Sequence, residues 1–186
     1  MGDFFWPALV GVFFVCWCLG AYNRLLRLRR QALASVQKLF VQLAEFRPLF
    51  ERRAPSHKEP SEPERRQEVM ASSDAVWVTL IAAAGQLDSA LQSASHTTLD
   101  STAIRNTSQA LEALQRSWTA ACEAPQDLAG EALPPELLTQ WGVLSHRMLA
   151  ARATANQDLA AYNQALAQVP VRWLALVVPF AAVAYF

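Results

Sequence analysis

Three histidines and three cysteines are the residues of this chain best suited to bind a metal ion. They are His57, His96, His146, Cys16, Cys18 and Cys122. A structural zinc site brings four such ligands together from closely spaced pairs. Here the histidines lie far apart, and two of the cysteines lie in an apolar run. Neither a metal site nor a disulfide framework is expected, and the cysteines are interpreted as apolar fillers.

Other catalytic patterns are equally weak. The chain has six glycines and no glycine-rich loop of the kind that cradles a phosphate. Serine, histidine and aspartate occur, but no nucleophile elbow singles one of them out. The carboxylates of Asp88, Glu112 and Asp158 are expected to face solvent rather than form an acid–base pair. The sequence therefore predicts a protein that is not an enzyme and has no cofactor.

Charge is segregated along the 186 residues of the chain. The formal net charge is zero, but residues 23–66 carry eleven basic and five acidic side chains. Residues 67–186 carry five basic and ten acidic ones. The basic residues gather near the start of the chain, without the interleaved aromatic residues of a nucleic-acid stacking platform. Nucleic-acid binding is not expected, and contact with lipid phosphates is the simpler interpretation.

An uncharged run, FFWPALVGVFFVCWCLGAY, covers residues 4–22. As a helix it would extend about 28 Å, close to the thickness of one hydrocarbon core. Only Asp3 precedes it, so the basic leader of a secretory signal peptide is missing. Four arginines follow: Arg24, Arg27, Arg29 and Arg30. The positive-inside rule then favours an uncleaved, single-pass anchor at 1–22, with the N-terminus outside and the rest of the chain in the cytoplasm.

The rest of the chain has the periodicity of long helices. Apolar residues from Leu25 to Phe50 recur every three or four positions, a coiled-coil-like seam. The four predicted helices cover 25–50, 67–94, 102–123 and 137–166. A charged, proline-rich linker at 51–66 separates the first two. The expected fold is all-α, with a transmembrane helix that continues into an antiparallel bundle of about four long helices at 23–168.

The C-terminal tail, residues 169–186, is a separate apolar element. Its last 14 residues carry no charge, but they are few for a span and Pro179 interrupts them. The tail is expected to fold back on the bundle, to lie at the membrane interface beside the anchor, or to bind a partner. The candidate interface residues are Trp173, Leu174, Phe180, Tyr185 and Phe186.

A Tyr-Asn pair stands at each end of the predicted bundle. Tyr22 and Asn23 begin the stretch YNRLLRLR, and Tyr162 and Asn163 begin YNQALAQVP. A tyrosine can bury its ring while its hydroxyl finds a partner, and an asparagine can cross-link helices through its amide. Both pairs are therefore candidate structural motifs.

These motifs resemble the LemA family. The family has an apolar N-terminal segment, a YNxLVxLR-like stretch that leads into VQL, and a second Tyr-Asn motif before a proline-containing end. This chain has VQL at 41–43 and ends in Tyr185 and Phe186. It departs from the family pattern in AEFRPLF after VQL, in the proline-rich linker, and at Pro179 and Ala181, which makes it a divergent match.

The resemblance implies an all-helical protein anchored in a bacterial inner membrane, without an established biochemical activity. A related protein acts in building magnetosome membranes, which suggests a role in assembly. The expected function is a non-enzymatic scaffold that contacts the bilayer and other membrane or cytoplasmic proteins, with a homo-oligomer among the assemblies that its seams allow. The alternatives are a membrane-shaping or lipid-interacting protein and an extracytoplasmic four-helix sensor domain.

Overall fold

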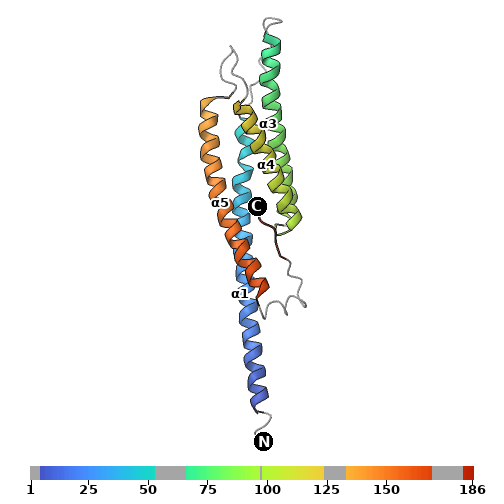
Figure 1. The fold of residues 1–186 in the computed structure, drawn as a ribbon, viewed down its shortest axis with the longest axis vertical. Coiled ribbons are helices and arrows are strands. Elements are labelled where there is room, and N and C mark those ends of the chain that lie inside the picture. The colour runs from blue at the N-terminus through green and yellow to red at the C-terminus, as the bar shows by residue number, and fades with distance from the viewer. Residues whose placement is uncertain (1–4, 53–65, 97, 124–132, 169–181) are drawn as a thin grey trace.

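The computed structural model describes residues 5–52, 66–96, 98–123, 133–168 and 182–186. Its helices are α1 (Phe5–Ala44), α2 (Phe46–Glu51), α3 (Arg66–Ser95), α4 (Ser101–Glu123) and α5 (Pro135–Ala167). No strand occurs among the described residues. Figure 1 shows an elongated bundle from which the N-terminal part of α1 extends alone. The predicted all-α bundle is confirmed.

α1 is one continuous helix of 40 residues. Its N-terminal part carries the apolar run, and its C-terminal part supplies buried residues of the core, from Leu25 to Leu43. Figure 1 shows no break where α1 enters the bundle. The apolar run and the first bundle helix are therefore a single element, so the orientation of one fixes the orientation of the other.

The first predicted helix is interrupted near its end, which the seam from Leu25 to Phe50 did not anticipate. α1 ends at Ala44 and α2 begins at Phe46. Pro48 explains the interruption, because it has no N–H to give to the carbonyl of Ala44 and its ring would clash with that carbonyl. The apolar stripe continues across the turn, since Phe46 and Phe50 are both fully buried.

α5 packs antiparallel to α1 along the length of the bundle (Figure 1). Two contacts define the register. Gln31 Nε2 donates to Asp158 Oδ1 at 2.8 Å, and the rings of Phe46 and Trp141 lie 4.9 Å apart. These contacts are 15 residues apart along α1 and α2 and 17 residues apart along α5. The C-terminal end of α5 therefore lies beside the start of the arginine cluster, which is Arg24, Arg27, Arg29 and Arg30.

α3 and α4 form a hairpin that packs on α1 and α2 through α3. The turn between them ends at Asp100, whose carboxylate accepts the backbone N–H of Ala103 at 3.3 Å and so caps α4. An ion pair joins the hairpin to α2, with Arg47 Nη1 and Asp88 Oδ2 2.6 Å apart. The helices are thus held together mainly by the packing of apolar side chains between them.

Four aromatic residues fill the end of the bundle farthest from the N-terminus. Trp118 on α4 and Trp141 on α5 stack at 4.2 Å with an angle of 12° between their rings. Phe50 lies within 6.1 Å of Trp118 and 5.9 Å of Trp141, between ring centroids. Phe46 packs edge-on against Trp141 at 4.9 Å. Large rings therefore connect α4 to α2 and α5, although the backbone of α4 stays apart from both.

Candidate functional site

The N-terminal part of α1 is apolar and uncovered. Its most apolar window of 18 residues has a mean hydropathy of 1.6, and only 6% of it is buried. Phe13 is 75% exposed and Leu19 is 56% exposed, whereas Leu25 is 1% exposed. Among the described residues α1 is the one helix long and apolar enough to cross a membrane. A helix with such a composition would be buried if it belonged to the core of a globular protein. In the described part of the isolated chain no apolar surface covers this stretch.

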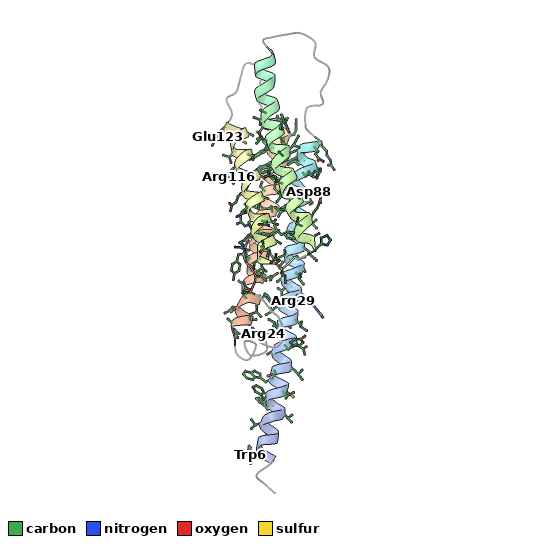
Figure 2. The ribbon with its side chains drawn as sticks, turned by 90° about the vertical axis from the view of Figure 1, so that its right-hand side faces the viewer. Trp6, Arg24, Arg29, Asp88, Arg116 and Glu123 are labelled. Carbon is green, nitrogen blue, oxygen red and sulfur yellow. The ribbon has the colours of Figure 1, made fainter. Side chains whose placement is uncertain are left out.

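The arginine cluster lies where exposure changes to burial. Arg24, Arg27, Arg29 and Arg30 all have exposed side chains. At about 100° per residue, Arg27 and Arg30 fall on the side of α1 turned away from its buried stripe, and Arg24 falls at about a right angle to it. Arg29 falls at the edge of the stripe and lies close enough to Tyr162 to act on its phenol electrostatically. Figure 2 shows Arg24 and Arg29 above the solitary stretch that ends near Trp6.

The second Tyr-Asn pair is built into the bundle. Tyr162 is 2% exposed, and burial raises the pKa of its phenol while the charge of Arg29 partly opposes that rise. The neighbouring Asn163 turns its amide to the chain terminus. Its Nδ2 donates to Val183 O at 2.7 Å, and Val183 N donates to its Oδ1 at 3.0 Å.

A second asparagine repeats this arrangement two helical turns earlier on α5. Asn156 Nδ2 donates to Phe186 O at 3.1 Å, and Phe186 N donates to Asn156 Oδ1 at 2.9 Å. Seven helical residues span about 10 Å, which matches three residues of extended chain. Asn156 and Asn163, called the amide clamp below, therefore hold residues 182–186, called the tail segment, as an extended strand that runs antiparallel to α5.

Two other helices complete the groove around the tail segment. Ser101 at the start of α4 donates its hydroxyl to Ala182 O at 3.3 Å and accepts the N–H of Ala184 at 3.1 Å. On α1, the ring of Phe40 packs edge-on against the ring of Phe186 at 5.9 Å. The groove around the tail segment thus has three walls. α5 and α4 form hydrogen bonds with its backbone, and α1 packs against the ring of Phe186.

The two Tyr-Asn pairs differ in their surroundings. Tyr22 is half-buried and Asn23 is exposed, whereas Tyr162 is buried and Asn163 binds the tail segment. Asn163 thus cross-links separate parts of the chain, as expected of the second pair, whereas the side chain of Asn23 is exposed. Asn156 and Ser101 were not identified from the sequence, although the spacing of seven between Asn156 and Asn163 was visible there.

The predicted tail residues fall partly outside the described structure. Trp173, Leu174 and Phe180 lie outside it. Tyr185 is 51% exposed and Phe186 is 9% exposed. The tail segment therefore follows the first of its three expected courses, which is to pack on the bundle. Because it runs back along α5, its end points away from the exposed part of α1.

The residues considered for chemistry do not come together in the described part of the chain. His96 is exposed in the turn after α3 and His146 is exposed on α5, and His57 lies outside that part. No group of three or more potential metal ligands occurs among the described residues. Asp88 and Asp158, expected to face solvent, are half-exposed, and they accept hydrogen bonds from Arg47 and Gln31 on other helices. Their carboxylates are therefore engaged in joining elements.

An open groove between α2 and α5 was also not anticipated. It is lined by aliphatic side chains together with the charged residues Glu45, Arg52 and Arg147. The mixture of charges and the open shape do not define a ligand by themselves. The amide clamp and the exposed apolar helix remain the two features with a specific geometry.

Comparisons of the chain with models of protein families, with curated proteins and with solved structures find no match.

Proposed function

We propose that this protein is a non-enzymatic, membrane-anchored scaffold whose helical bundle stands on the bilayer and organises other proteins there. The supporting observation is the change along α1, which passes without a break from exposed apolar residues to core residues. Lipid supplies the apolar surroundings that the exposed part lacks.

The arginine cluster supports the same placement. All four side chains are exposed, and Arg27 and Arg30 lie on the open side of α1, where they can reach lipid phosphates. The positive-inside rule assigns this end, and the bundle with it, to the cytoplasmic side. Since α5 ends beside the cluster, the base of the bundle sits close to the membrane surface.

The assembly role rests on two supports. The resemblance to the LemA family suggests it, and the long rigid bundle offers lateral surface for contacts with other proteins. Aromatic packing at one end and the amide clamp at the other hold the helices together. A rigid body of this kind, fixed to a membrane at its base, suits a protein that positions partners.

Alkaline extraction of membranes tests the anchor. The full chain is expected to stay in the membrane pellet. Val12 and Val15 are 65% and 56% exposed, so Val12→Arg combined with Val15→Arg should release the protein while the bundle keeps its helical content. The matched control is Val12→Leu with Val15→Leu, which stays in the pellet. Release of the wild-type chain would refute the anchor.

Trypsin accessibility tests the orientation. The chain carries cleavage sites from the end of α2 to the first residue of α3, at Arg52, Arg53, Lys58, Arg65 and Arg66. They are expected to be protected in intact spheroplasts and cleaved once the membrane is opened. Cleavage in intact spheroplasts would place the bundle outside and favour the sensor alternative. If the protein purifies alone at every stage of growth, the scaffold role is wrong even where the anchor stands.

Lipid interaction is the second candidate function, and the exposed arginines favour it. The bundle with its arginines is expected to bind vesicles that contain anionic lipid more tightly than neutral vesicles, and added salt should weaken the difference. Equal binding to both kinds of vesicle would remove this candidate.

A further inference from the structure

The groove that holds the tail segment recognises main-chain atoms. Each clamp asparagine offers one donor and one acceptor to one residue, as a neighbouring β-strand would. Ser101 adds another donor and acceptor from the opposite side. These bonds depend on an extended backbone and not on particular side chains.

Side-chain selection comes from two positions only. Val183 and Phe186 are buried at 5% and 9% exposure, whereas Tyr185 between them is 51% exposed. The groove therefore fits an extended peptide with two apolar residues spaced three positions apart. Peptide-binding sites that add a strand work in the same way: hydrogen bonds to the peptide backbone give affinity, and pockets for particular side chains give specificity.

The chain that joins α5 to the tail segment is longer than the seated position requires. Asn163 lies only four residues before the end of α5 at Ala167, about 6 Å along the helix axis. Residues 169–181 intervene before the tail segment, and thirteen residues can extend to about 45 Å. The covalent connection is thus long enough to reach a groove on a neighbouring molecule.

We propose that the amide clamp is a peptide-binding site that takes the tail segment of a second copy of this chain. Two copies anchored by α1 stand in the same orientation, so their grooves lie at the same height above the membrane. Exchange of tail segments preserves every contact seen within one chain, which makes it a low-cost route to association. This inference rests on the proposed anchoring, which supplies the common orientation.

Disulfide trapping between two differently tagged copies tests the exchange. In a full chain without Cys16, Cys18 and Cys122, one copy carries Ser101→Cys and the other carries Ala184→Cys, because these two residues are in contact. Co-expression in membranes followed by mild oxidation is expected to give a disulfide-linked species that carries both tags. Adding Asn163→Leu to the Ser101→Cys copy should lower its yield about fivefold or more, since the clamp then loses two hydrogen bonds.

Two controls make each result decisive. A single chain with both cysteines reports whether the tail segment is seated in its own groove, and Tyr185→Cys, at an exposed position, should give little cross-linking to Ser101→Cys. Cross-linking only within one chain would overturn the exchange, as would cross-linking that ignores Asn163→Leu, or none at all. Alkaline extraction of the same membranes reports on the anchor separately, so that a failure of anchoring is distinguished from a failure of exchange.

Discussion

The side-chain amide of Asn163 pairs with the backbone of Val183 through two hydrogen bonds, of 2.7 and 3.0 Å. The two residues are twenty positions apart, and the pairing fixes the end of the chain to α5. Asn156 makes the equivalent pair with Phe186. Val183 and Phe186 are therefore part of the folded bundle.

Removing the clamp amide should destabilise the bundle. Asn163→Leu leaves the N–H and carbonyl of Val183 without partners, and we expect the free energy of unfolding to fall by about 1–3 kcal/mol. Denaturant titration in mild detergent, followed by circular dichroism, measures the change. Asn23 is the matched control, because its side chain is exposed, and Asn23→Leu should change stability by less than about 0.5 kcal/mol. Equal effects of the two variants would contradict the structural difference between the two Tyr-Asn pairs.

Tyr162 should make stability depend on alkaline pH. Burial raises the pKa of its phenol above the ordinary value, which is about 10. The folded state then favours the neutral phenol, so this contribution is complete below about pH 10 and is lost as the pH rises through the folded-state pKa. Tyr162→Phe should therefore lose less stability between pH 9 and pH 11 than the wild type. Tyr185→Phe, at an exposed ring, should follow the wild-type curve, and parallel curves for all three proteins would refute the prediction.

The aromatic cluster should carry a large part of the stability. Phe46 is fully buried against Trp141, so Phe46→Ala should cost about 3–5 kcal/mol through lost burial and the cavity left behind. Thermal unfolding monitored by tryptophan fluorescence detects both the loss and the change around Trp141. Val41, 63% exposed on α1, provides the comparison, and Val41→Ala should change stability by less than about 0.5 kcal/mol. A small effect at Phe46 would mean that the cluster is loosely packed.

The arginine cluster should set the orientation of the anchor. Replacing Arg24, Arg27 and Arg30 with glutamine removes the positive charge beside the apolar run, and part of the population should then insert with the bundle outside. Trypsin cleavage in intact spheroplasts measures that fraction. Arg29 is left in place because it lies beside Tyr162. Replacing Arg116, Arg147 and Arg152 on the bundle removes equal charge at a distance and should leave the orientation unchanged; mixed insertion of this control would refute a local effect.

Helix positions could be predicted because helical periodicity is local. The stretches predicted at 67–94 and 102–123 agree with α3 and α4 to within one residue at each end. The interruption at Glu45 was missed because the apolar stripe continues through it. The signal was present in Pro48, whose missing N–H and ring act on the carbonyl four residues earlier. An apolar pattern reports which face is buried, and it does not report whether each backbone hydrogen bond can form.

The sequence alone determined the all-α class, the exposed apolar helix and the basic cluster that follows it, because composition and spacing express all three directly. The tertiary structure decided which asparagines bind the tail segment. Asn23 and Asn163 follow a tyrosine in the same way, yet only Asn163 faces the tail segment. The partner of an amide is chosen by what the fold brings within about 3 Å, and Ser101, Asn156 and Phe186 meet only after α1, α4 and α5 have packed.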